Sequence, residues 1–434
     1  MISFDDVETL ITKSASSGIR PGLERIERLL SILGNPQADY PAIHVVGTNG
    51  KGSTCAFLAS VFQAGGYKTA LYTSPHLENP GERLTVDGRL LSPERWIACA
   101  EKVTEAASRD DSLRTDPPSF FELVTAAAFL LAAEEKVDIA VVEAGLGGRL
   151  DATSLLTDVV CTGAASISMD HTEYLGNTLQ AIAGEKFAVV RAGVPACYLG
   201  DNESLIPLFE RFCRDAKAEP FVVSRDAVLG GVAVTEDGCV FDFSAGGLKL
   251  KRGRTRMLGR HQALNAALAL SVLSRVTDCA KFSRLTEDTI RAGILNARWP
   301  GRLEIVSGGG GKSPLVVLDG GHNPDGVAKL AESVTELWGD KKIGVVYAAM
   351  KDKDYPACIK NLGKLGAAFY ATAVPGTERS LAAEEAASAA RKELVRGAFE
   401  NPLDAIAEAS QDNDVVLVCG SLYFIGWARP RVAR

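Results

Sequence analysis

The sequence predicts an α/β protein with two domains, each built on a mostly parallel sheet. In both halves of the chain, short apolar runs alternate with stretches of helical periodicity, an order typical of doubly wound parallel sheets. A loop rich in glycine, with one lysine, joins the first strong strand to a helix, as in P-loop ATPases. A fresh alternation follows a run of four glycines, and 434 residues leave room for two or three domains.

The first predicted domain alternates strands and helices. Strands are expected at residues 43–46, 68–72, 139–142 and 159–167, and helices at 53–63 and 120–135. Gly65 and Gly66 end the first of these helices, and Ser119 with Glu122 forms a capping-box pattern at the start of the second. The strand at 139–142 is apolar on both faces, as a central strand of a parallel sheet requires.

The pattern changes in the middle of the chain and then starts again. Residues 227–250 predict β-hairpins, with the basic run KLKRGRTR interpreted as a solvated face, and helices are expected at 259–275 and 286–297. The pattern breaks near residues 296–302, and we place the domain boundary there. The predicted domains are 1–297 and 298–434. The second is a smaller, Rossmann-like α/β domain. Its strands are expected at 315–318, 343–348, 367–373 and 415–419, and its helices at 326–337 and 382–393.

Composition excludes several classes of protein. Acids outnumber bases by 54 to 47, a net charge of -7, which argues against a general nucleic-acid-binding protein. Nine scattered cysteines without a C-x-x-C pair indicate reduced thiols, not a disulfide framework or a zinc site. The acidic start MISFDDVETL does not resemble a signal peptide, and no apolar stretch approaches roughly 18 residues. We therefore expect a cytoplasmic protein without a membrane span, and a monomer.

The stretch HVVGTNGKGST, residues 44–54, predicts a phosphate-binding loop. It departs from Walker A spacing, because Val45 stands where that motif has its first glycine and Gly52 is inserted between Lys51 and Ser53. Glycines let backbone N–H groups approach a phosphate, Lys51 adds positive charge, and the next helix points its positive end at the ligand. Ser53 is placed to contact Mg²⁺. The alternative is a glycine-rich turn without a ligand.

Glu143 is a candidate metal-binding residue. It ends the apolar strand that precedes GLGGRLDAT. Ligands of open α/β sheets lie at the carboxyl ends of strands, and an acid there can hold Mg²⁺ as a Walker B acid does. An ion pair with Arg149 is the structural alternative. The glycines alone are a weak dinucleotide signal, because no helix pattern follows them.

Two more polar residues follow in the first domain. His171 stands beside Asp170 after the strand expected at 159–167, where an imidazole suits a second metal or an ordered water. A structural role for this histidine stays equally open. Lys186 follows Glu185 in a predicted helix, and a helical lysine is usually a solvated charge.

A second polar cluster is expected in the second domain. The stretch LDGGHNPDG, residues 318–326, places Asp319, His322 and Asn323 at the end of a strand. RWPGR lies just upstream, so we infer that this domain closes over the nucleotide of the first. Arg302 is then a candidate for stabilising the transferring phosphate, as an arginine finger does.

The motifs taken together resemble a known family. GTNGKGS, TSPHL, FFELVTAAAF, EAGLGGRLDAT, DHTEYLG, GRHQALNA, WPGRLE, LDGGHNP, DKD and GSLYF occur in this order. Between Gly22 and Phe424 the chain resembles folylpolyglutamate synthase and the bifunctional dihydrofolate synthase of the Mur ligase superfamily. The resemblance implies transfer of the γ-phosphate of ATP to a carboxylate, followed by attack of the L-glutamate amine to give an amide, ADP and phosphate. Such chemistry relies on positioning and charge neutralisation.

The resemblance also assigns roles to residues. Catalytic roles fall to Lys51, Glu143, His171, Lys186 and Arg302. ATP contacts fall to Thr48, Asn49, Gly50, Lys51, Gly52, Ser53, Asn265, Arg302, Asp319 and His322. Two Mg²⁺ ions would be held by Ser53, Ser74, Glu143, His171 and a carbamylated Lys186. Dihydropteroate or a reduced folate would contact Gly22, Leu23, Glu24, Arg25, Ser119, Phe120, Phe121, Glu122 and Leu150. The second domain would bind glutamate.

The match has departures and leaves alternatives open. The family continues EKAGI where this chain has EKFAVVRAGVP, and DGAHNP is here DGGHNP. A synthase that only extends the glutamate tail is one alternative, and a Mur-type ligase for a cell-wall precursor is another. A Mur-type ligase for a cell-wall precursor usually carries a further domain before the loop. In this chain the loop stretch already begins at His44, which disfavours that alternative. A regulatory P-loop NTPase would need an N-K-x-D motif, which is absent.

Overall fold

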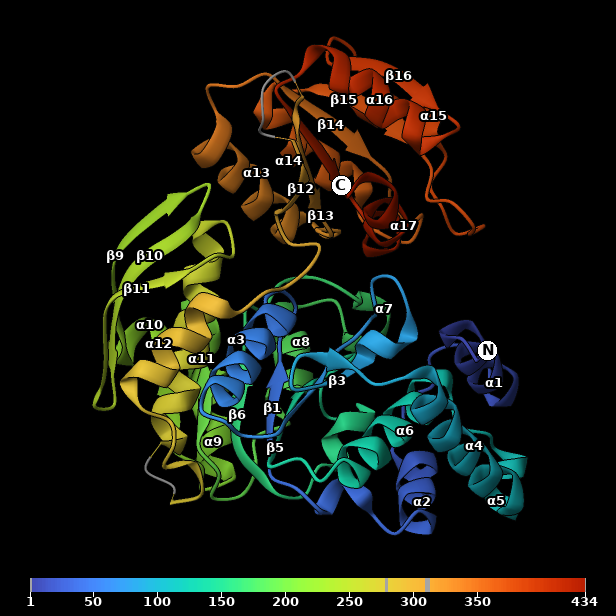
Figure 1. The fold of residues 1–434 in the computed structure, drawn as a ribbon, viewed down its shortest axis with the longest axis vertical. Helices are drawn as coiled ribbons and strands as arrows, with labels where there is room; N and C mark the ends of the chain where they lie inside the picture. Colours follow the sequence, from blue (N-terminus) through green and yellow to red (C-terminus); the bar gives the residue numbers. More distant parts are fainter. Residues whose placement is uncertain (1, 278–279, 309–312, 434) are drawn as a thin grey trace. The chain divides into compact units, whose positions relative to one another are not determined.

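The computed structural model describes residues 2–277, 280–308 and 313–433 (Figure 1). The chain forms two compact units. The first contains the residues up to 231 together with 241–254 and 264–297, and the second contains 232–240, 255–263 and 298–434. Parts of the predicted hairpins and of the next helix therefore belong to the second unit. The predicted glycine turn falls largely on 309–312, outside the described residues.

The first unit is built on an eight-stranded sheet with the order β4-β3-β2-β5-β1-β6-β7-β8. Its strands are β1 (Ala42–Val46), β2 (Thr69–Tyr72), β3 (Leu84–Val86), β4 (Arg89–Leu90), β5 (Ile139–Glu143), β6 (Val159–Ala164), β7 (Ala196–Tyr198) and β8 (Pro220–Val222). β3 and β4 form an antiparallel edge on an otherwise parallel sheet. β1 lies between β5 and β6, with Val45 opposite both Glu143 and Gly163, so the loops after these three strands leave the same edge.

Helices cover this sheet and share its core. They are α1 (Phe4–Ser14), α2 (Glu24–Ile32), η1 (Pro36–Ala38), α3 (Lys51–Ala64), η2 (Pro80–Arg83), α4 (Pro93–Arg109), α5 (Asp111–Thr115), α6 (Phe120–Glu134), η3 (Ala152–Leu155), α7 (Thr172–Leu175), α8 (Leu179–Phe187), η4 (Glu203–Leu205), α9 (Ile206–Asp215), α10 (Val223–Asp226), α11 (Arg260–Val276), η5 (Ala280–Phe282) and α12 (Glu287–Asn296). Alternate residues of β5, Ala140 and Val142, pack with α1, α2, α4 and α6 in one hydrophobic cluster. These helices gather on one side of the unit in Figure 1.

A three-stranded sheet confirms the predicted hairpins. Its order is β11-β10-β9, formed by β9 (Val228–Thr235), β10 (Gly238–Ala245) and β11 (Leu248–Thr255). The lysines and arginines of the basic run in β11 are exposed at 249, 251, 252 and 254, while Leu250 is buried. This alternation is that of a solvated hairpin face.

The second unit has a six-stranded sheet with the order β12-β13-β17-β14-β15-β16. Its strands are β12 (Glu304–Ser307), β13 (Leu315–Asp319), β14 (Ile343–Tyr347), β15 (Ala368–Thr372), β16 (Val395–Phe399) and β17 (Val415–Cys419). Its helices are α13 (Pro324–Trp338), α14 (Tyr355–Leu362), η6 (Gly363–Leu365), α15 (Ala383–Ala389), α16 (Pro402–Asp412) and α17 (Leu422–Val432). β12 is antiparallel and the other strands are parallel. Val317, Val345 and Leu417 pack with Trp338 of α13 in its core.

Two predicted elements differ from the structure in length. The strand expected at 159–167 ends at Ala164, because the chain turns there to bring Ser166 to the phosphate loop. The helix expected at 382–393 ends at Ala389, and the strand β16 follows after a short turn. The capping box at the start of α6 is confirmed, with Ser119 and Glu122 exchanging side-chain bonds to each other's backbone N–H.

Candidate active site

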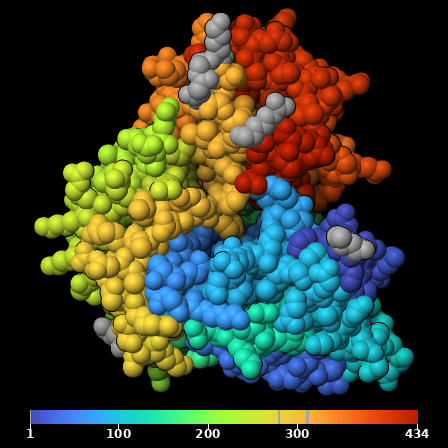
Figure 2. Space-filling view, in the orientation of Figure 1, coloured from blue at the N-terminus to red at the C-terminus, as the bar shows by residue number. Residues whose placement is uncertain are grey.

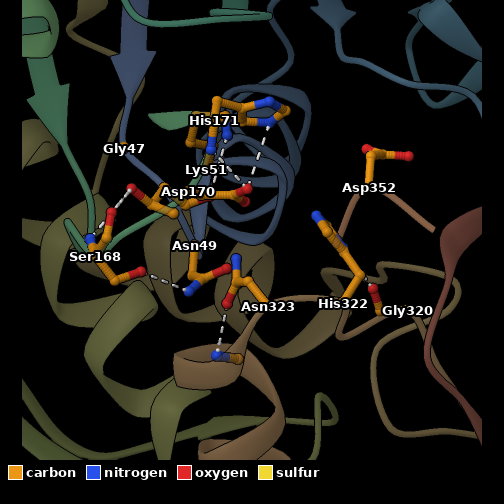
Figure 3. Close-up of polar contacts among 12 residues, drawn as sticks. Gly47, Asn49, Lys51, Ser168, Asp170, His171, Gly320, His322, Asn323 and Asp352 are labelled. Carbon is orange, nitrogen blue, oxygen red and sulfur yellow. Dashed lines mark hydrogen bonds and ion pairs between the residues drawn. The ribbon is translucent and has the colours of Figure 1, made fainter. Parts of the chain in front are cut away.

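The loop between β1 and α3 is held in place by the segment that follows β6. The backbone N–H groups of Thr48 and Asn49 donate to Ser166 O at 2.7 and 3.3 Å. The Thr48 hydroxyl donates to Ser168 O and accepts from Ser168 N, and Asn49 Nδ2 donates to Ser168 Oγ at 3.3 Å (Figure 3). These bonds fix the loop from its outer side, so its inner N–H groups are pre-organised for an anion.

Gly50 makes the turn from the loop into α3. Its φ is +86°, a left-handed conformation that glycine adopts without strain. A Cβ at this position would overlap Oδ1 of Asn265, a residue of α11 that is 5% exposed. Asn265 therefore packs against the loop, which fits its predicted place at the nucleotide. Whether it contacts ATP stays a prediction.

Lys51 and Glu143 form the charged centre of the loop. Lys51 Nζ lies 3.8 Å from Glu143 Oε1 and donates to Thr48 O at 3.2 Å. Glu143 Oε2 accepts from the backbone N–H of Ser74 at 3.3 Å, and Glu143 is 4% exposed. A cation and a carboxylate thus lie at the carboxyl ends of β1 and β5, where the sequence predicts the phosphate and Mg²⁺ to bind.

The structural alternative for Glu143 named Arg149 as its partner. Arg149 instead donates from Nε and Nη2 to Glu185 Oε1, at 3.1 and 2.9 Å. The cation beside Glu143 is Lys51, which belongs to the loop. An ion pair that ties Glu143 to the glycine loop favours the ligand-binding interpretation of this carboxylate.

Lys186 is buried, contrary to the usual expectation for a helical lysine. It lies in the last turn of α8, is 4% exposed, and donates from Nζ to Gly47 O at 2.8 Å. Burial, with the nearby charge of Lys51, lowers the pKa of Lys186 to about 7. The next residue, Phe187, departs from the family pattern and fills an aromatic cluster with Tyr198 and Phe209. The helix therefore stays anchored while its lysine points to the loop.

His171 lies at the same edge of the sheet, one residue before α7. Its φ is +50°, and its backbone N–H donates to Oδ1 of Asp170 at 2.9 Å (Figure 3). The His171 side chain is 41% exposed, and Nε2 lies 3.9 Å from the same carboxylate oxygen. An accessible imidazole beside an acid can ligate a metal or hold a water, so both interpretations from the sequence remain predictions.

Mg²⁺ is implied by these residues. Among the described residues, no three His, Cys, Asp or Glu side chains cluster as a metal cage. Mg²⁺ usually takes only one or two carboxylates and completes its shell with phosphate oxygens and waters. Glu143, and the hydroxyl of Ser53 in the first turn of α3, fit a Mg²⁺ that binds together with a nucleotide.

Asp151 is a buried carboxylate close enough to Lys186 for its charge to act on that lysine, and the sequence motifs did not single it out. It is 3% exposed, and its Oδ2 accepts from Leu146 N at 2.7 Å, inside the GLGG segment. Its Oδ1 accepts from the Thr153 backbone and hydroxyl, and that hydroxyl contacts His44 Nε2 at 2.8 Å. Asp151 therefore shapes the loop after β5, and Leu150 beside it is half-buried. The signal was an aspartate followed by threonine two positions on, a helix N-cap pattern.

The predicted folate-side motifs come together through one ion pair. Arg25 of α2 is 8% exposed, and its Nε lies 3.2 Å from Glu122 of α6. Asp116 is a second acid, 3.5 Å from Arg25 Nη1. Glu122 is predicted both to cap α6 and to contact the folate substrate. Its carboxylate does cap α6, and the same carboxylate pairs with Arg25. Gly22, Leu23 and Glu24 lead into α2, while Phe120 and Phe121 are half-buried at the start of α6.

In the second unit, Asp319 organises the predicted cluster. Its Oδ2 accepts from Leu303 N at 2.9 Å and its Oδ1 from Gly321 N at 2.7 Å. Burial raises the pKa of Asp319, and the charge of Arg302 opposes that rise. The carboxylate thus joins the WPGRLE segment to the DGGHNP segment, as a positioning residue. Its predicted ATP contact is untested.

The neighbours of Asp319 have clear partners. His322 Nδ1 lies 2.9 Å from Gly320 O, and Asn323 caps α13 by accepting from Gly326 N at 2.8 Å (Figure 3). Arg302 Nη1 donates to Gly301 O at 3.3 Å. Asn323 therefore stabilises the start of α13, while Arg302 and His322 stay candidates for ligand contact.

Comparisons with known proteins decide the family. Residues 301–422 match the family model of the Mur ligase, glutamate ligase domain. The chain is 35% identical over 437 residues to the dihydrofolate synthase/folylpolyglutamate synthase of Bacillus subtilis (strain 168), covering 99% of each chain. The chain belongs to the dihydrofolate synthase/folylpolyglutamate synthase family. It is an ATP-dependent ligase of the Mur type, and the resemblance drawn from its motifs is confirmed.

Two solved structures of this family share the fold and contain ADP. Mycobacterium tuberculosis folylpolyglutamate synthase complexed with ADP matches with a TM-score of 0.90 and 31% identity, over 99% of this chain and 98% of that one. E. coli FolC in complex with DHPP and ADP matches with a TM-score of 0.87 and 27% identity, over 99% and 97%. The predicted two-domain α/β fold is confirmed. No helix of the described residues is long and apolar enough to cross a membrane.

Proposed function

We propose that this chain adds L-glutamate to dihydropteroate and to reduced folates. The observation that carries the proposal is the Lys51–Glu143 pair at the glycine loop, in a chain whose relatives are complexed with ADP. ATP would phosphorylate a carboxylate of the acceptor, releasing ADP. The amine of glutamate then attacks the acyl carbon, an amide forms, and phosphate leaves as the nitrogen loses a proton.

The residues of the first unit would position the phosphates. Residues 48–53 would hold them through backbone N–H groups and the start of α3, while Lys51 neutralises negative charge. Mg²⁺, when bound at Glu143, Ser53, Ser74 and His171, would neutralise further charge on the phosphates. Glu143 keeps Lys51 in place, because the two groups form an ion pair.

Lys186 fits the carbamylated lysine of the family. Carbamate formation needs a neutral amine, and a pKa of about 7 leaves much of Lys186 uncharged near neutral pH. The carbamate would place a negative group beside Lys51 and join the second Mg²⁺ site with His171. Activity should then fall in CO₂-depleted buffer and recover when bicarbonate is added.

The second unit would supply the remaining groups. Arg302 would stabilise the transferring phosphate, and residues near His322 would contact ATP when this unit closes over the first. Its match to the glutamate ligase domain supports a place for L-glutamate there. We further propose that the enzyme works in the cytoplasm as a monomer.

Phosphate release from Mg-ATP with L-glutamate tests the function. Parallel reactions contain dihydropteroate, tetrahydrofolate or no acceptor. Release with both acceptors, and none when acceptor or glutamate is omitted, is the expected result. Release with tetrahydrofolate alone would identify a chain extender, and no acceptor-dependent release would refute the assignment of folate substrates.

A further inference from the structure

Arg83 is a buried cation that the phosphate and metal chemistry does not use. It ends η2, in the segment that connects β2 to β3, and is 8% exposed. Its Nε donates to His76 Nδ1 at 3.1 Å, and its guanidinium lies 5.4 Å from the ring centroid of Phe120. Figure 2 shows this segment, in light blue, at the surface of the first unit.

Arg83 differs from the equally buried Arg25 in its partners. Arg25 is also 8% exposed but pairs with both Glu122 and Asp116. Within the described residues, Arg83 has no carboxylate within 4.0 Å. The adjacent Glu82 is occupied, since its two oxygens accept from the backbone N–H groups of residues 77–79. A buried charge without a counter-ion is costly, and an incoming anion would relieve that cost.

His76 adds a second donor next to the guanidinium. Because Nδ1 accepts from Arg83, Nε2 carries the proton and donates. Arg83 and His76 therefore both offer N–H groups, a pattern that selects an acceptor-only anion such as a carboxylate.

The position of this pair suits an acceptor carboxylate. His76 lies two residues after Ser74, whose N–H bonds Glu143 at the phosphate loop. Phe120, stacked under Arg83, is followed by Phe121, whose ring occupies the space a Cβ of Gly145 would need. Arg83 thus bonds to the segment that carries Ser74 and packs on Phe120 at the start of α6.

We propose that Arg83, with His76, binds the α-carboxylate of the terminal glutamate of a folate acceptor. This proposal rests on the proposed function. The reacting carboxylate is committed to the phosphate at Lys51, so a separate, permanently charged guanidinium fits the carboxylate that stays ionised throughout. Dihydropteroate lacks such a group, because its single carboxylate is the reacting one. Arg83 would therefore serve tail extension and be dispensable for the first glutamate addition.

Arg83→Gln tests this assignment, with Arg28→Gln as the matched control. Arg28 is an exposed arginine paired with Asp110, so its change alters the same charge elsewhere. The KM for tetrahydrofolate should rise about 10- to 100-fold in Arg83→Gln, with that for dihydropteroate within about twofold of wild type. Arg83→Lys, which keeps the charge but loses the planar fork, should be intermediate. Equal losses with both acceptors, or no loss, would overturn the proposal.

Equilibrium binding separates this proposal from the proposed function. Wild type should bind tetrahydrofolate about 10- to 100-fold more tightly than its α-carboxamide, and Arg83→Gln or Arg83→Lys should shrink that difference. This binding measurement needs no turnover. If wild type binds the acid more tightly than the amide but never ligates glutamate to the folate, the proposed function is refuted and the Arg83 assignment is supported. Wild type that does not discriminate between the acid and the amide would overturn the assignment even if Arg83→Gln fails to fold.

Discussion

The charges of Lys51 and Lys186 depend on their surroundings and not on the glycine motif itself. Lys51 is partly neutralised by Glu143, whereas Lys186 is buried and donates to a backbone carbonyl. Two lysines at one loop repel each other, and the more deeply buried one loses its proton more easily. The pair therefore combines a lysine that is ion-paired with a carboxylate and a buried lysine whose pKa of about 7 leaves much of it uncharged near neutral pH.

Lys186 should make stability depend on pH. Its folded-state pKa is lowered to about 7 from its ordinary value of 10.5, so the unfolded chain binds more protons between these pH values. The free energy of unfolding should therefore rise with pH above about 7, by up to about 1.4 kcal/mol per pH unit from this group. Denaturant titrations in CO₂-free buffer from pH 6.5 to 9 should show a smaller rise in Lys186→Met. An identical slope in both proteins would contradict the burial argument.

Glu143→Gln should raise the Mg²⁺ requirement. The amide loses the negative charge that attracts Mg²⁺ but keeps the shape that contacts Lys51 and Ser74. The Mg²⁺ concentration for half-maximal activity should increase on the order of 10- to 100-fold. Glu185→Gln, which removes the partner of Arg149, is the control and should leave this value unchanged. An unchanged requirement in Glu143→Gln would return Glu143 to a purely structural role.

At the scale of elements, the sequence predicted the frame of the site but not its finer connections. The strand, glycine loop and helix around Lys51 were recognisable because local spacing determines all three. The burial of Lys186 and the lack of an acid beside Arg83 within the described part of the chain depend on residues far apart in sequence, which periodicity does not reveal. Asp151 was missed similarly, since its bond to Leu146 closes a loop without regular structure. The early end of β6 follows from the tertiary bond to Thr48.

The start of α3 gives a prediction at this scale. Gly50→Ala places a Cβ against Asn265 and forces a left-handed φ, whereas Gly34, with φ of +85°, has nothing within 4 Å of the position that a Cβ would take. Gly34→Ala should cost about 1–2 kcal/mol from backbone strain alone. Gly50→Ala should cost more stability than Gly34→Ala, as measured by thermal denaturation. It should also weaken ADP binding at least tenfold, as measured by calorimetry. Equal ADP affinity in the two variants would show that the contact with Asn265 does not shape the phosphate loop.

At the scale of the whole molecule, the residues predicted to act on the nucleotide come from two units. The loop with Lys51 belongs to the first, and Arg302 with Asp319 to the second. Each unit positions its own groups by internal bonds, Ser166 to Thr48 in one and Asp319 to Leu303 in the other. A ligase built this way can bind nucleotide with one unit and still depend on the other for phosphate transfer.

Arg302→Ala tests this division of labour. If Arg302 stabilises charge only as the phosphate transfers, kcat should fall about 10³- to 10⁵-fold, while the affinity of the first unit for ADP stays within about twofold. Arg298→Ala, which changes a nearby arginine of the same unit, is the comparison. Rapid-quench measurement of acyl phosphate formation, without glutamate, should show that this first step is the one slowed. Normal acyl phosphate formation in Arg302→Ala would instead assign the arginine to a later step, and a parallel loss of ADP affinity would make it a ground-state nucleotide contact.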